Sequence, residues 1–184
     1  MLNITQLLQD SIYFDNKIID QRDLLMGPNA HLQEIVVNCD RSLAACYEPK
    51  IDYRMQKNGV QKLEHEELLR RFVITLHWFL LFSARKQWTH LVVMSEQDYQ
   101  RLLKSQRASQ LAKADQQYLT IKYFLMASYY THRQADFRHA WHLLLKYGLV
   151  DLELTPTEIM QKHEELIKTN LSKWQIAINK LNKF

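Results

Sequence analysis

The stretch LRRFVITLHWFLLF, residues 69–82, decides the fold class. It is apolar along most of its length, which predicts a helix buried in the core. Two basic residues, Arg70 and Arg71, lie near its start, and His77 lies in its middle. Acidic residues precede it, where the dipole of a helix favours negative charge. We therefore expect a core helix from about Leu63 to Lys86 with a charged beginning.

Apolar residues recur at helical spacing over most of the remaining chain. Only three glycines and three prolines occur in 184 residues, which favours long helices joined by few loops. A short helix is expected after Ser95, and longer ones over about 5–22, 31–47, 63–86, 109–132, 135–147 and 156–181. The sequence predicts an all-α bundle of six or seven helices in a single domain, residues 1–184.

Turn and cap residues refine these bounds. The sequence TPTE at 155–158 is typical of a capping box with proline at the first helical position. Pro49 is expected to end the second helix, and Gly148 is expected to end the sixth. Residues 51–62 are expected to form an exposed loop, and 87–93 a short extended piece.

The composition points to a soluble cytoplasmic protein. The net charge of +4 and the pI near 9.0 are mildly basic, but lysine and arginine are spread along the chain, so nucleic-acid binding is not indicated. Cys39 and Cys46, two helical turns apart, suit buried thiols in a reducing cytosol. The N-terminal sequence lacks the basic start and apolar core of a signal peptide. The longest apolar run, 72–82, is too short to span a membrane.

Motifs with catalytic or metal-binding spacing are absent from the sequence. The eight histidines form no HExxH pattern and the cysteines no CxxC pattern, so a zinc site is not predicted. A residue such as His77 is more often a hydrogen-bonded core histidine than a ligand. Glu64 and Glu67, an i, i+3 pair, are better explained by the helix dipole than by a metal ion. The run QKHEELIK, residues 161–168, is expected to be a solvated helix face.

Four short fragments, taken in order, resemble the all-α dimeric dUTPases, relatives of the MazG-type nucleoside triphosphate pyrophosphohydrolases. In that family a first helix reads LD..I, a second reads ELGELANEW followed by lysine, a third reads E..D.LHF.L, and a late helix carries asparagine followed by a basic residue. The matching positions are Phe14-Asp15 with Ile18, Leu43-Ala44 with Tyr47 and Lys50, Leu76-His77-Trp78-Phe79, and Asn170 with Lys173. The resemblance covers about residues 5–180 and rests on order and spacing.

The resemblance implies magnesium ions held by clustered carboxylates, which bridge the phosphates and activate a water. In this register the acidic positions are occupied by Cys39, Ser42, Cys46, Arg71 and Ile74. Ser11 falls where the family has a glutamine associated with uracil recognition. A shifted register that makes Glu34 a ligand leaves Val37 at the next acidic position. We therefore expect no cofactor, although the family uses magnesium.

The first functional hypothesis is a catalytically inactive, dUTPase-like protein that binds a deoxyribonucleotide or a protein. Nucleotide-binding roles are then assigned to Lys50, Arg71, His77, Asn170 and Lys173. In this hypothesis Arg71 replaces the charge of magnesium at a phosphate, whereas the simpler interpretation is that it faces solvent at a helix start. The alternatives are an active magnesium-dependent dUTP or dNTP pyrophosphohydrolase with displaced ligands, and an unrelated helical adaptor or nucleic-acid-binding module. The family also implies a homodimer, for which aromatic helices around Trp78 and Tyr123 offer surface.

Overall fold

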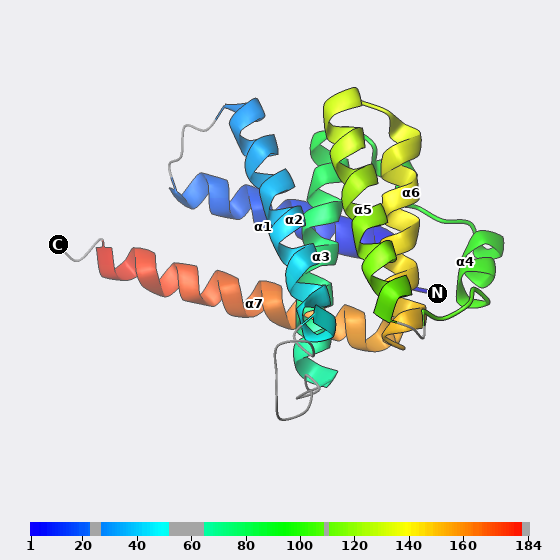
Figure 1. Cartoon of the computed structure of the whole chain (residues 1–184). Coiled ribbons are helices and arrows are strands. Elements are labelled where there is room, and N and C mark those ends of the chain that lie inside the picture. Colours follow the sequence, from blue (N-terminus) through cyan, green and yellow to red (C-terminus); the bar gives the residue numbers. More distant parts are fainter. Residues whose placement is uncertain (23–26, 52–64, 109–110, 182–184) are drawn as a thin grey trace.

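The computed structural model describes residues 1–22, 27–51, 65–108 and 111–181, and over these ranges the chain forms seven α-helices and no β-strand (Figure 1). The all-α prediction is confirmed. The helices are α1 (Ile4–Arg22), α2 (Pro28–Ile51), α3 (His65–Arg85), α4 (Glu96–Leu103), α5 (Leu111–Thr131), α6 (Gln134–Lys146) and α7 (Pro156–Leu181). A 3-10 turn, η2 (Thr89–Leu91), follows α3, and a wide π-helical turn, η3 (Tyr147–Asp151), follows α6.

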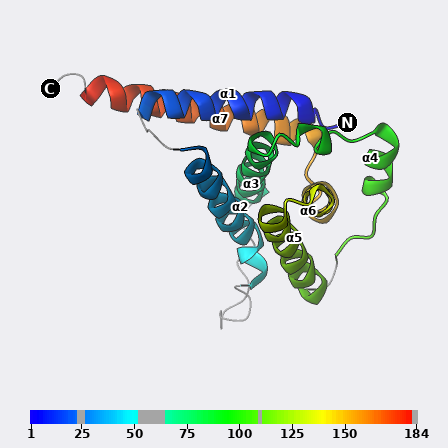
Figure 2. The same ribbon diagram turned by 90° about the horizontal axis from the view of Figure 1, so that it is seen from above.

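The helix α3 occupies the centre of the fold. The helices α2, α3, α5 and α6 lie beside one another in one layer, and α1 and α7 lie side by side across it (Figures 1 and 2). Because α3 contacts α2 in its own layer and both helices of the other layer, it is buried along most of its length. Its buried residues are Leu69, Phe72, Val73, Thr75, Leu76, Phe79, Leu80, Leu81, Phe82 and Ser83. This position explains why residues 69–82 are apolar on several sides of the helix.

Both predicted N-caps are confirmed. At the start of α4, Ser95 Oγ accepts a hydrogen bond from the backbone N–H of Asp98 at 3.1 Å. At the start of α7, Thr155 Oγ1 accepts from the N–H of Glu158 at 3.2 Å, and the Glu158 carboxylate accepts from the N–H of Thr155 at 2.8 Å. This reciprocal pair satisfies donors that the beginning of the helix leaves without helical partners, so α7 begins where the sequence predicts.

Three local predictions are wrong. Residues 87–93 contain the 3-10 turn η2 rather than an extended piece. The helix α2 continues past Pro49 to Ile51, and Gly148 does not end the helical path, because the chain winds on through η3. The predicted loop at 51–62 lies outside the described residues, apart from its first residue.

The sequence's cysteines and aromatic residues divide between core and surface. Cys39 and Cys46 are both free thiols and both buried, as predicted. On α3, Phe79 is fully buried within the chain, whereas Tyr123 and Tyr130 are exposed on α5. Within the described ranges, no helix has the length and apolar character needed to cross a membrane.

Gly148 packs directly against the ring of Phe72. A Cβ atom built on Gly148 would lie 2.1, 2.4 and 2.6 Å from three ring carbons of Phe72, well inside van der Waals contact. Phe72 is fully buried, so its ring cannot move aside without displacing its neighbours. The absence of a side chain at position 148 is therefore what allows η3 to lie on α3.

Gly148→Ser is expected to destabilise the protein by about 1–3 kcal/mol, because the added atoms overpack the contact with Phe72. Gly27→Ser is the matched control. Nothing lies within 4 Å of a Cβ at Gly27, and serine is favourable at the N-cap position before Pro28. Urea unfolding measures both variants, and equal stability of the two would contradict the close packing of η3 on α3.

Candidate functional site

A cavity of about 280 Å³ lies between α1, α2 and α3. The lining residues are Phe14, Asp15, Ile18, Ile19, His31, Glu34, Asn38, His77, Trp78 and Leu81. Aromatic and aliphatic side chains thus share the cavity with two carboxylates, two imidazoles and one amide. A mostly apolar cavity with a few convergent polar groups is typical of a site for a small ligand.

The carboxylate of Asp15 joins the three helices beside this cavity. Its Oδ2 accepts a hydrogen bond from the guanidinium of Arg85 at 2.5 Å, and its Oδ1 lies 3.1 Å from Nε2 of His31. Arg85 ends α3, and His31 lies in the first turn of α2. Asp15 and His31 are buried, where a carboxylate is stable only with such partners. The charge of Asp15 is therefore balanced within the protein.

His77 is held through a buried serine that also contacts a second histidine. Its Nδ1 lies 2.9 Å from Ser11 Oγ, which lies 3.1 Å from Nε2 of His163 on α7. Ser11 and His163 are buried, and His77 is partly exposed. Burial, aided by the proximity of His163, lowers the pKa of His77 to about 3, and burial lowers the pKa of His163 to about 4. Both rings are therefore neutral at pH 7.

Glu34 and Asn38 are the lining residues with unused hydrogen-bonding capacity. They lie one helical turn apart on α2, and both are partly buried. Neither forms a hydrogen bond or ion pair with another residue in the described part of the chain. The Asn38 amide can both donate and accept, and the Glu34 carboxylate can accept. These two groups are available to a ligand in the cavity.

Of the five residues assigned nucleotide-binding roles from the sequence, His77 lines the cavity. The interpretation of His77 as a hydrogen-bonded histidine is also confirmed. Arg71 lies on α3 on the N-terminal side of the cavity-lining residues, and Asn170 lies on α7; neither lines the cavity. Lys50 and Lys173 belong to α2 and α7, but their side chains lie outside the described residues.

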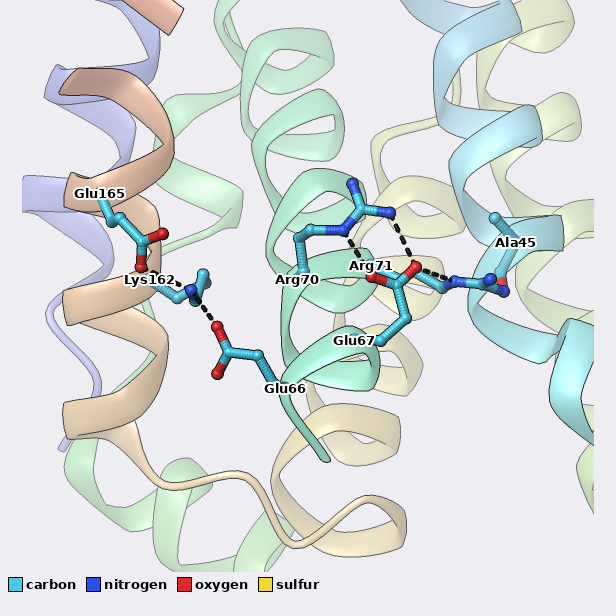
Figure 3. Close-up of polar contacts among 7 residues, drawn as sticks. All are labelled: Ala45, Glu66, Glu67, Arg70, Arg71, Lys162 and Glu165. Atoms are coloured by element: carbon cyan, nitrogen blue, oxygen red, sulfur yellow. Dashed lines mark hydrogen bonds and ion pairs between the residues drawn. The ribbon is translucent and has the colours of Figure 1, made fainter. Parts of the chain in front are cut away.

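Arg71 satisfies a carbonyl group that α2 leaves without its helical donor. Pro49 has no N–H, so the carbonyl of Ala45, four residues earlier, lacks its usual helical hydrogen bond. The Arg71 guanidinium donates to this carbonyl at 2.8 Å and to the Glu67 carboxylate at 2.7 Å (Figure 3). The Arg71 side chain is 19% exposed. It thus holds α3 against the C-terminal end of α2 rather than facing solvent alone.

The residues at the positions that the resemblance assigns to metal ligands do not fit magnesium. The Cys46 thiol lies 3.1 Å from the Thr75 hydroxyl, and burial raises its pKa to about 12. Burial also raises the pKa of the Cys39 thiol well above its usual range. Magnesium takes hard oxygen ligands, and protonated thiols beside a guanidinium offer none. Among the described residues, no group of three or more His, Cys, Asp or Glu side chains is placed to hold a metal ion.

The segment 161–168 is not the fully solvated helix face that the sequence predicts. Lys162 and His163 are buried. The Lys162 ammonium contacts Glu66 on α3 and Glu165 on its own helix (Figure 3). A buried ammonium group requires such charged partners. The Lys162–Glu66 ion pair links α7 to α3 next to His163, which contacts Ser11.

Comparisons with family models, curated proteins and solved structures give no match to this chain. The dUTPase-like resemblance therefore stays a prediction. The geometry of the cavity and of its surroundings carries the functional argument.

Several residues of the site are missed by reasoning from the sequence. His163 and Arg85 belong to segments that show no motif, so only the folded chain brings them to Ser11 and Asp15. A usable signal was the helical spacing of polar residues within apolar runs. On α2, His31, Glu34 and Asn38 are separated by three and four residues, which places them on one face.

Arg71→Ala is expected to destabilise the protein by roughly 1–3 kcal/mol, because it leaves the Ala45 carbonyl without a donor. The matched control is Arg70→Ala. Arg70 also binds Glu67 but is 45% exposed, so its loss should cost less than about 1 kcal/mol. Urea unfolding measures both, and equal losses would contradict the role of Arg71 on α2.

A double substitution tests the same contact more directly. In a Pro49→Ala background, residue 49 regains an N–H that can donate to the Ala45 carbonyl. The cost of Arg71→Ala is then expected to fall by about 1 kcal/mol relative to its cost in the wild-type background. Strictly additive effects in urea unfolding would show that the proline and the arginine act independently.

Stability is expected to fall as the pH is lowered from 7 to 5. Unfolded histidine binds a proton near pH 6.5, whereas His77 and His163 resist protonation until about pH 3 and 4 in the folded state. The unfolded state therefore binds more protons in this window, which costs about 2 kcal/mol per buried histidine at pH 5. Urea unfolding at both pH values measures the loss. His163→Gln should reduce the dependence of the free energy of unfolding on pH, whereas His90→Gln, at an exposed position, should leave it unchanged. The same pH dependence in the wild type and both variants would contradict the burial of a neutral His163.

Proposed function

We propose that the protein binds a deoxyribonucleotide in the α1–α2–α3 cavity and does not hydrolyse it through magnesium. One observation carries this proposal. Phe14-Asp15-Ile18 and His77-Trp78, which belong to two fragments that resemble the dUTPases, are more than fifty residues apart in sequence and line the same cavity. Such convergence is expected if the fragments share a binding role, and it does not follow from helical periodicity alone.

The chemistry of the lining supports a nucleoside. Phe14 and Trp78 offer aromatic surface against which a base can pack. The Asn38 amide offers a donor and an acceptor, as the edge of a base requires. A volume of about 280 Å³ lies just below the range of sites for drug-sized ligands, so it suits a base and sugar. Glu34 adds negative charge, so the phosphates of a nucleotide are expected to lie outside the cavity.

The absence of suitable magnesium ligands at the matching positions supports a binding role without hydrolysis. Among the described lining residues the carboxylates are Asp15 and Glu34. Asp15 is already paired with Arg85 and His31, which leaves Glu34 as a single free carboxylate. An active enzyme with displaced ligands would need further carboxylates, so we place it second.

The remaining expectations stay predictions. The homodimer is implied by the resemblance alone, and the exposed residues Leu119, Tyr123 and Tyr130 on one face of α5 are the described surface best suited to it. A helical adaptor or nucleic-acid-binding role would require a surface that the even spread of charge does not indicate. Cytoplasmic localisation rests on composition.

The proposal predicts that dUMP or dCMP raises the melting temperature in the presence of EDTA. At a ligand concentration of 100 times Kd the stabilisation is about 2.7 kcal/mol, or roughly 5 °C or more for a chain of this size. Asn38→Ala should reduce the shift, because the base loses its amide partner. Asn29→Ala, an exposed position on the same helix, should leave the shift unchanged.

Three other outcomes are informative. A shift that appears only with Mg²⁺, together with release of pyrophosphate from dUTP, would move the active-enzyme hypothesis to first place. A shift that both asparagine variants retain would place the ligand elsewhere on the molecule. No shift with any nucleotide would contradict the proposed function.

A further inference from the structure

Three helices meet at the hydroxyl group of Ser11. Ser11 lies on α1, His77 on α3 and His163 on α7. The Ser11 Oγ atom lies 2.9 Å from His77 Nδ1 and 3.1 Å from His163 Nε2. Ser11 is completely buried and His163 is 2% exposed. The hydroxyl group therefore depends on these two rings for its hydrogen bonds.

His77, Ser11 and His163 form a row of hydrogen-bonded groups, here called the relay, whose protons can be arranged in two ways. A serine hydroxyl has one proton, so it donates to one ring and accepts from the other. If His163 donates from Nε2, Ser11 donates to Nδ1 of His77, and the proton of His77 lies on Nε2. If His77 donates from Nδ1, Ser11 donates to Nε2 of His163, and Nε2 of His77 is an acceptor. Both arrangements satisfy every buried group between the rings.

The free nitrogen of His77 is accessible to a ligand. The His77 ring lines the cavity, and its Nδ1 is directed at Ser11. Within the described residues, Nε2 has no hydrogen-bond partner and is not sealed from solvent. A ligand in the cavity therefore meets either a donor or an acceptor at this atom, according to the arrangement of the protons in the relay.

We propose that Ser11 and His163 are positioning residues that let His77 present either a donor or an acceptor to a heterocyclic base in the cavity. This inference rests on the proposed function and names the ligand class more closely. When the arrangement reverses, the Ser11 proton moves to Nδ1 of His77 and the Nε2 proton of His163 moves to Ser11. One proton then leaves Nε2 of His77 to water and one is taken up from water at Nδ1 of His163, so the net charge is unchanged. No oxidant or cofactor is involved.

Deoxyuridine and deoxycytidine are the matched probes. Uracil offers a donor at N3 and an acceptor at O4, whereas cytosine offers an acceptor at N3 and a donor at N4. A histidine that faces N3 and is fixed in one tautomer would pair with one base and leave an unpaired buried group with the other. The relay predicts that the wild-type protein binds the two nucleosides with Kd values within about threefold.

His163→Leu should fix the tautomer. With His163 removed, His77 is the one ring left within hydrogen-bonding distance of Ser11 in the described part of the chain. We expect the hydroxyl to donate to Nδ1 of His77, which holds the His77 proton on Nε2. The ratio of the two Kd values, measured by calorimetry, is then expected to change by about tenfold or more. His163→Gln restores a side chain that can donate or accept, so it should return the ratio to the wild-type value. Equal weakening of both nucleosides by His163→Leu would mean that His163 only supports the fold, and would overturn the proposal.

A measurement without ligand separates this proposal from the proposed function. The ¹⁵N shifts of His77 report its tautomer in the full-length protein. The relay predicts intermediate shifts in the wild type, a single Nε2–H tautomer in His163→Leu, and intermediate shifts again in His163→Gln. A single, unchanged tautomer in all three would overturn the relay. If neither nucleoside binds while the tautomer still responds to His163, the relay stands and the nucleotide-binding function fails.

Discussion

The hydrogen bonds of the Ser11 hydroxyl group are the constraint on which the rest of the site depends. This one atom contacts His77 of α3 and His163 of α7, so the two layers of the fold meet at a polar point inside the core. A buried polar group is stable only when it is satisfied. The position of α1 is therefore coupled to those of α3 and α7. The same coupling sets the cavity wall, because Phe14 and Asp15 follow Ser11 by one helical turn.

A second constraint holds α2 against α3 at the opposite end of their contact. Pro49 removes a helical hydrogen bond, and Arg71 replaces it through the Ala45 carbonyl. In the same region, the Cys46 thiol and the Thr75 hydroxyl form a hydrogen bond. Packing and hydrogen bonding thus fill a place where the resemblance implies clustered carboxylates. Carboxylates clustered there without a metal ion would repel one another, whereas the groups present stabilise the helix pair as it stands.

The sequence predicts the helices well because their signals are local. The apolar run at 69–82 and the capping box at 155–158 each depend on residues close together in the chain, and both are confirmed. The extent of α2 was missed because the partner that compensates for Pro49 lies twenty-two residues away. The burial of Lys162 and His163 was missed for the same reason. Their charged and polar partners lie on α1 and α3, so the run looks solvated when it is considered alone.

The candidate site is half predictable in the same sense. His77 and the residues around Phe14 are identified from the sequence, but the pairing of Asp15 with Arg85 and His31 requires the fold.

The most direct test of the proposed site is a titration with dUMP in EDTA, followed through the indole N–H signals of the tryptophans. Trp78 lines the cavity, whereas Trp88 and Trp141 are buried elsewhere in the core. We expect the Trp78 signal to shift and saturate while the Trp88 and Trp141 signals stay unchanged; an unmoved Trp78 signal at high dUMP concentration would contradict the proposed site.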